Sequence, residues 1–180
     1  MNKRTFAIVS FGSLFLVLVG AIAANDEKEV AKHIKTLQTS KDKSARLSAV
    51  YDLALIASLN PAPVKPAIPS LIEAFKSDKD PKLRAAACYA LWNSGADPKP
   101  VIDCYIAALN EEKDEPEVRE AAAAQLFGYA YRKMIDAKQA KEARLALKKV
   151  QQEESKKDKA KQNDKLKEYI LQALDYLPLD

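Results

Sequence analysis

The stretch that decides the fold occurs twice in this chain. Residues 80–91 read DPKLRAAACYAL, and residues 115–126 read EPEVREAAAAQL, 35 positions later. A weaker copy, DKSARLSAVYDL, occupies residues 42–53. An arginine, an alanine and a leucine keep their places in all three copies: Arg46, Arg84 and Arg119; Ala49, Ala87 and Ala122; Leu53, Leu91 and Leu126. Self-similarity at such a period indicates tandem structural repeats.

A second pattern precedes each copy. Apolar residues with the spacing i, i+3, i+4, i+7 form one face of a helix, and they recur as Ile68, Leu71, Ile72, Phe75 and then as Ile102, Tyr105, Ile106, Leu109. Val30, His33, Ile34 and Leu37 are a weaker first version. Each unit is therefore predicted to be a helix A, a tight turn and a helix B. Pro81 and Pro116 suit the first turn of helix B, and Gly95 suits the left-handed residue that closes one.

The period loosens after Tyr129. Ala140, Ala143, Leu147 and Val150 predict one more helix, and residues 153–164 are polar and lysine-rich, which is typical of a solvated extension or linker. A last amphipathic helix is predicted from Leu166 to Leu177, ended by Pro178. We interpret the region from about residue 135 as a fourth, stretched unit, because terminal repeats are often atypical.

Residues 1–24 have the pattern of a secretory signal peptide. A positive start is followed by the apolar run Phe6–Gly20 and by small residues that allow cleavage after Ala23 or Ala24. The alternative is an uncleaved anchor, because Thr5–Ala24 is long enough to span a bilayer. We therefore expect a bacterial protein in the periplasm or outside the cell, with one folded domain over residues 25–180.

Composition agrees with an all-α domain. The chain has 180 residues, 4 glycines and 7% aromatics, and such a mix favours helices over strands. Its formal net charge is +4, of which Lys3 and Arg4 supply two. The remainder is close to balanced, so nothing in the charge requires a nucleic-acid partner.

The repeated stretch resembles the second helix of HEAT repeats, most closely the short bacterial kind that also occurs in phycobilisome lyases. Residues 80–95 and 115–128 carry the resemblance best. It implies an α–α superhelix, a right-handed solenoid of about four helical hairpins, that acts as a protein-interaction or scaffold module. An enzyme-associated, lyase-type subunit is the alternative that the resemblance leaves open, as is a membrane-tethered scaffold if the N-terminal segment is retained.

The recurring arginines Arg46, Arg84 and Arg119 have a structural interpretation. A guanidinium offers several donors in a fixed plane, so each arginine is expected to bond turn carboxylates or carbonyls of a neighbouring unit and form a ladder.

We find no catalytic, metal-binding or cofactor-binding pattern, and we predict that the protein is not an enzyme. His33 is the single histidine, and we interpret it as a partly buried packing residue. Cys88 and Cys104 lie on helices that should be neighbours, and an oxidising compartment would permit a disulfide between them. A buried free thiol is the alternative, because the Cα separation that a disulfide needs is narrow.

A partner surface is predicted on the B helices. Positions 85, 89 and 92 share a face distinct from the buried positions, and the equivalent places in the other units extend it. The resulting aromatic stripe consists of Tyr51, Tyr89, Trp92, Phe127 and Tyr131. Aromatic residues are frequent binding anchors, but an apolar stripe at helical spacing also fills space between helices.

A basic stretch is the second candidate surface. Residues 132–149 hold seven basic and two acidic residues, the basic ones being Arg132, Lys133, Lys138, Lys141, Arg144, Lys148 and Lys149. Such a helix could meet anionic lipid or an acidic protein, although a solvated helix face explains it as well. From the sequence we expect a protein or peptide partner, no nucleic acid, and a membrane only if the N-terminal segment is retained.

Overall fold

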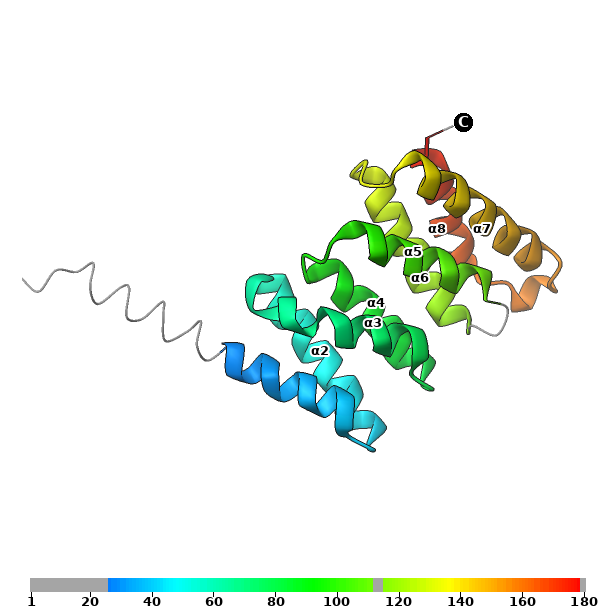
Figure 1. Cartoon of the computed structure of the whole chain (residues 1–180). Coiled ribbons are helices and arrows are strands. Elements are labelled where there is room, and N and C mark those ends of the chain that lie inside the picture. The colour runs from blue at the N-terminus through cyan, green and yellow to red at the C-terminus, as the bar shows by residue number, and fades with distance from the viewer. Residues whose placement is uncertain (1–25, 112–114, 179–180) are drawn as a thin grey trace, which may run out of the picture.

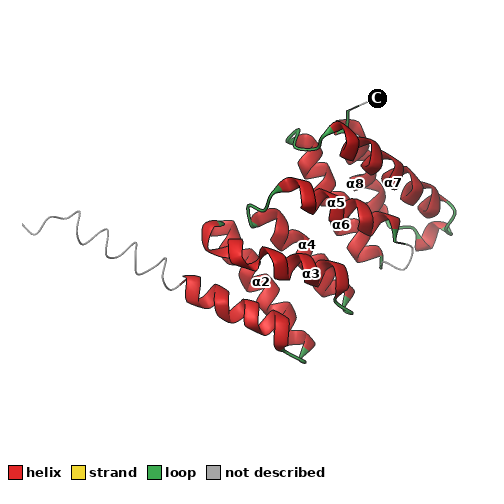
Figure 2. Cartoon of the chain, in the orientation of Figure 1, coloured by secondary structure: helices red, strands yellow, loops and turns green. Residues whose placement is uncertain are grey.

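Helices make up the regular structure of this chain (Figures 1 and 2). The computed structural model describes residues 26–111 and 115–178. Its elements, in order, are a helix over residues 26–39, α2 (Lys43–Leu59), the 3₁₀ helix η1 (Ala62–Ala67), α3 (Ile68–Ser77), α4 (Pro81–Asn93), α5 (Pro98–Asn110), α6 (Pro116–Tyr131), α7 (Ala137–Ser155), the 3₁₀ helix η2 (Lys159–Lys161) and α8 (Asp164–Tyr176).

The helices form four antiparallel hairpins stacked in two layers (Figure 1). The A layer contains the helix over residues 26–39, then α3, α5 and α7, and the B layer contains α2, α4, α6 and α8. Within the described part of the chain, consecutive B helices pack directly against each other, and each later hairpin packs as a pair. This arrangement confirms the predicted all-helical solenoid of about four hairpins.

The helix ends follow from local chemistry. Aspartate or asparagine side chains accept a backbone N–H at the start of five helices: Asp42, Asp80, Asp97, Asp136 and Asn163. These side chains satisfy donors that the first helical turn leaves unpaired. Gly95 closes α4 with a φ of 65°, as its place after the helix predicted. The proline-rich η1 was not predicted, and it joins α2 to α3.

Small residues on the B helices explain the close packing of that layer. Ala86, Ala87 and Ala90 of α4 are buried, as are Ala121–Ala123 of α6. Large side chains of the A helices, such as Tyr105 and Leu71, fill the space between the layers. The resulting core is continuous from Val30 to Leu177, so each hairpin hides the apolar face of the next.

The segment over residues 153–164 is largely exposed and leads from α7 to α8, as predicted for a solvated linker, except at Glu154. Helix α7 continues to Ser155, and the Glu154 side chain is buried at 1% relative exposure. One of its carboxylate oxygens accepts the backbone N–H of Asn163 at 3.0 Å, and the other bonds the Lys157 ammonium. The stretch is therefore exposed apart from one buried carboxylate, which its composition does not reveal. The predicted signal peptide lies outside the described residues.

Candidate functional site

Two of the three repeat arginines connect neighbouring hairpins. Arg46 of the first unit makes two bonds to the Asp78 carboxylate in the second, with nitrogen–oxygen distances of 3.0 and 3.1 Å. Arg119 of the third unit reaches Glu153 of the fourth at 2.7 Å and donates to the Glu111 carbonyl at 2.8 Å. Arg84 donates to the carbonyl of Asp78 at 2.9 Å. Arg46 and Arg119 therefore bond the neighbouring unit, as expected for a ladder, whereas this bond of Arg84 lies within the second unit.

Asp78 is the best-defined acid of this ladder. Burial raises the pKa of Asp78, but the hydrogen bonds from Arg46 and from the backbone of Asp80 outweigh burial, so the pKa lies below its ordinary value. The bidentate pair therefore stays ionised at neutral pH and holds the first hairpin to the second.

A hollow on the B layer is the candidate partner site. It has a volume of about 390 Å³, and three successive B helices line it: α2 through Tyr51; α4 through Lys82, Ala85, Ala86 and Tyr89; α6 through Glu117 and Glu120. Helices of three successive hairpins therefore share one hollow. We call this hollow the B groove.

Two tyrosines line the B groove and are not part of the hydrophobic core. Tyr51 is 57% exposed and Tyr89 is 43% exposed. Neither ring stacks on another aromatic ring within the described residues. Partial burial, followed by the nearby Cys88, Tyr169 and Glu120, raises the pKa of Tyr89 to about 12. The phenol therefore remains a neutral hydrogen-bond donor across the physiological pH range.

The walls of the B groove are charged. Glu117 and Glu120 lie on the α6 side, and Lys82 lies on the α4 side. Glu120 also accepts a hydrogen bond from the Asn163 side chain at 3.0 Å, which fixes its carboxylate against the start of α8. The groove thus combines an alanine floor, two phenols and fixed charges, a surface suited to a polypeptide partner.

Trp92 packs between helices instead of joining this groove. Its ring lies over Gly128 of α6, where an added Cβ would stand 2.7 Å from the ring. Its centroid is 4.7 Å from that of Tyr129 in an edge-to-face contact, and the Arg132 guanidinium lies 4.3 Å from the ring centroid. The space-filling alternative therefore describes Trp92 better than a partner anchor does.

The last two residues of the predicted stripe belong to a separate cluster. Phe127 and Tyr131 meet Tyr176 of α8, and the three ring centroids are 5.2–6.2 Å apart. Tyr131 and Tyr176 are both more than half exposed. The predicted stripe is thus divided into the B groove, the packed Trp92 and this second aromatic cluster.

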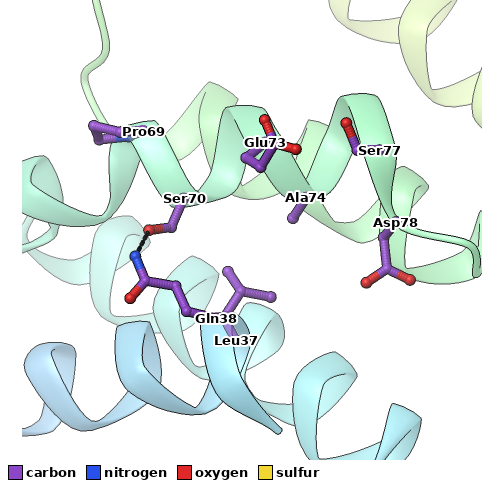
Figure 3. Close-up of a pocket in the computed structure, with 8 residues that line it drawn as sticks. All are labelled: Leu37, Gln38, Pro69, Ser70, Glu73, Ala74, Ser77 and Asp78. Atoms are coloured by element: carbon purple, nitrogen blue, oxygen red, sulfur yellow. Dashed lines mark hydrogen bonds between the residues drawn. The ribbon is translucent and has the colours of Figure 1, made fainter. Parts of the chain in front are cut away.

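A second hollow lies in the other layer (Figure 3). It has a volume of about 420 Å³ between the helix over residues 26–39 and α3. Gln38 points across it and donates to the Ser70 hydroxyl at 2.8 Å, while Asp78 at its end is held by Arg46.

Both cysteines are free in the structure, so the considered disulfide is absent. Cys88 is fully buried in α4, and the Tyr105 hydroxyl donates to its carbonyl at 3.0 Å. Cys104 lines a separate small hollow between α3 and α5, together with Phe75 and Lys76. Burial raises the pKa of both thiols, which makes them poor nucleophiles.

His33 is partly buried between two helices. Its Nδ1 lies 3.6 Å from an Asp52 oxygen, and its Nε2 lies 3.7 Å from a Glu29 oxygen. Within residues 26–111 and 115–178, no three histidine, cysteine or acidic side chains are grouped closely enough to hold a metal ion.

The basic residues of the stretch 132–149 have different structural roles. Arg132 covers Trp92, and Arg144 donates to the Leu177 carbonyl at 2.5 Å at the end of α8. Lys149 donates to the Asn110 carbonyl at 3.3 Å, and Lys133 lies beside Tyr176 in a small hollow. Lys138, Lys141 and Lys148 are exposed on α7.

Sequence reasoning missed several residues of these sites. Lys82 and Glu117 occupy equivalent repeat positions one turn before positions 85 and 120, so the repeat register could have placed both beside Tyr89. Tyr176 carries no such signal, because only the packing of α8 on α6 brings it to Phe127.

Comparison with known proteins gives one family match. The family model described as HEAT repeats matches residues 68–147, which include α3–α6 and the first half of α7. No curated protein matches the chain. None of the helices in the described part of the chain is long and apolar enough to cross a membrane.

Proposed function

The HEAT-repeat model matches residues 68–147 of this chain, and from that similarity we propose that the protein is an exported HEAT-like scaffold that binds a protein or peptide partner through the B groove. HEAT repeats suggest a protein-interaction role, because stacked hairpins leave an extended surface that the core does not use. The groove supplies a defined place for such a partner.

The observation that carries this proposal is the exposure of Tyr51 and Tyr89 on neighbouring B helices. Their rings are 57% and 43% exposed, and both line the same hollow. Tyrosine buries a large area on binding at a small entropic cost, and such rings dominate many interfaces. A partner that covers both rings removes their exposed apolar area from water, which favours binding.

Binding is proposed in preference to catalysis. The B groove is lined by tyrosine, alanine, lysine and glutamate, and the two thiols lie elsewhere with raised pKa values. A lyase-type subunit is the second reading, and it would be favoured if the purified protein carried a small-molecule chromophore.

The proposed location is the bacterial periplasm or the cell exterior. It rests on the positive, apolar and small-residue zones of residues 1–24. Intact-mass measurement of the protein from its natural host is the test. A mature chain that begins at Ala24 or Asn25 supports export, whereas an intact N-terminus indicates a membrane-tethered scaffold.

Binding is tested with a double variant, Tyr51→Ala with Tyr89→Ala. We expect capture of the envelope partner to fall at least roughly tenfold, since two anchors are removed. Thermal unfolding should be nearly unchanged, because neither ring belongs to the core.

The matched control is Tyr131→Ala with Tyr176→Ala. It removes two tyrosines of similar exposure from the second aromatic cluster, and partner capture should be retained. Loss of capture in the control alone would assign binding to that cluster and overturn the B groove.

A further inference from the structure

Positive charge is concentrated at one end of the chain. Residues 132–167 hold 13 lysines and arginines against six acidic residues, whereas residues 26–131 hold 14 against 16. The small net charge of the whole chain therefore combines a slightly acidic first part with a strongly basic terminal hairpin. Such an asymmetry produces a local field that attracts anions.

The outward face of α7 concentrates this charge. Lys138, Lys141, Leu145, Lys148 and Lys156 follow one another at helical spacing, opposite the buried Ala143, Leu147 and Val150. The Lys138 side chain is 84% exposed, and Leu145 at the middle of the face is 63% exposed. We call these five residues the basic face.

The lysines of the basic face are not used in ion pairs that stabilise the fold. Lys141, Lys148 and Lys156 form no ion pair within the described residues, and Lys138 only approaches Glu142 at 3.8 Å. Other cations of this hairpin do have structural partners. Lys157 holds the buried Glu154.

The basic face is also sterically available. Figure 1 shows α7 at the end of the stack opposite the helix over residues 26–39. The helix packs on α5 and α8, and its exposed side points away from both. The B groove is lined by α2, α4 and α6, so a ligand on α7 leaves it open.

We propose that the basic face docks on an anionic lipid bilayer, with α7 lying along the membrane surface. The helix has 19 residues, and this length corresponds to roughly 28 Å of contact. Four ammonium groups meet lipid phosphates, and Leu145 enters the headgroup boundary. Each lysine near an anionic surface strengthens binding roughly fivefold, and added salt weakens it. This inference is independent of the B groove.

The test is co-sedimentation with lipid vesicles. The chain from Asn25 onward is used, because it keeps the whole core from Val30 to Leu177 and lacks the apolar N-terminal segment. Vesicles with about one third phosphatidylglycerol in phosphatidylcholine should bind the protein, and pure phosphatidylcholine should not. Binding should be lost at about 0.5 M salt, where charges are screened within a few ångströms.

Two quadruple variants make the test specific. Lys138, Lys141, Lys148 and Lys156→Gln should weaken vesicle binding at least roughly tenfold. Changing Lys28, Lys32, Lys35 and Lys41 to Gln removes the same charge from the other end, and it should alter binding by less than about twofold. Leu145→Gln should weaken binding roughly threefold and leave the salt dependence unchanged.

Three outcomes would overturn the proposal. Equal losses in the two quadruple variants would mean that net charge acts without a defined face. Equal binding to pure phosphatidylcholine would show that the negative charge of the lipid headgroups does not drive binding. Binding to soluble polyglutamate as tight as to vesicles would assign the face to an acidic polypeptide instead of a bilayer.

Discussion

Between α4 and α6 two helices meet through alanines and one aromatic ring, whereas the terminal hairpin adds an arginine–glutamate pair and a buried carboxylate to its apolar contacts with α6. Trp92 lies over Gly128 at the first junction. At the second, Arg119 reaches Glu153, while Glu154 and Asn163 organise the long turn before α8. Both junctions produce the same two-layer stack. Apolar packing therefore sets the geometry of the repeat, whereas the polar contacts that organise the turns differ between units.

The largest expected effect is at the apolar junction. Trp92→Ala should lower the free energy of unfolding by about 3 kcal/mol, because it removes a ring packed against Tyr129 and leaves a cavity. Urea denaturation measures the loss. Tyr51→Ala is the control, with an expected change below about 0.5 kcal/mol. A loss as small as the control would return Trp92 to the list of partner anchors.

The next effect tests the charged junction. Glu154→Gln should cost about 2 kcal/mol at pH 7, because the buried carboxylate bonds Lys157 and the Asn163 N–H. The exposed Glu142→Gln should cost less than about 0.5 kcal/mol. If both changes were equally mild, buried charge would not be what holds the terminal hairpin.

The same variant predicts a pH dependence. Burial raises the pKa of Glu154, but the bonds from Asn163 and Lys157 outweigh burial, so the folded-state pKa lies below the ordinary 4.5. Stability from this group is fully present above pH 4.5 and is lost as the pH falls through the folded-state pKa. The difference between wild type and Glu154→Gln, measured by urea denaturation, should therefore shrink in acid.

A smaller effect is expected at Gly128, which faces the Trp92 ring in the apolar junction. Gly128→Ala should cost about 1–2 kcal/mol, although alanine is the better helix former, because its Cβ would meet the Trp92 ring. In the Trp92→Ala background the same change should stabilise the protein. A double-mutant cycle in urea measures the change of sign, and additivity of the two losses would contradict the contact.

The smallest expected effect concerns the ends of two B helices. Gly95 closes α4 with a φ of 65°, and Lys133 closes α6 with a φ of 57°. Lys133→Gly should therefore raise the free energy of unfolding by about 0.5–1 kcal/mol, because glycine adopts this conformation without strain. Thermal unfolding measures the gain, and Gly95→Ala should show the opposite sign.

Several features were predictable because their cause is local. The apolar spacing around Leu71 and Ile102 placed two A helices, Pro81 and Pro116 placed the starts of two B helices, and Gly95 placed one end. The predicted linker over residues 153–164 is largely exposed, but the burial of Glu154 was not predictable, since one buried carboxylate leaves the composition of a lysine-rich stretch unchanged.

The sequence by itself determined the hairpins, their stacking and the faces that they bury, because helix period and turn chemistry act within a few residues. Only the tertiary structure decided which aromatic rings remain exposed. Tyr89 and Trp92 are three positions apart on one helix, yet one lines the B groove and the other packs on Gly128. The physical reason is that exposure depends on where α6 lies, and no local pattern in α4 encodes the position of another hairpin.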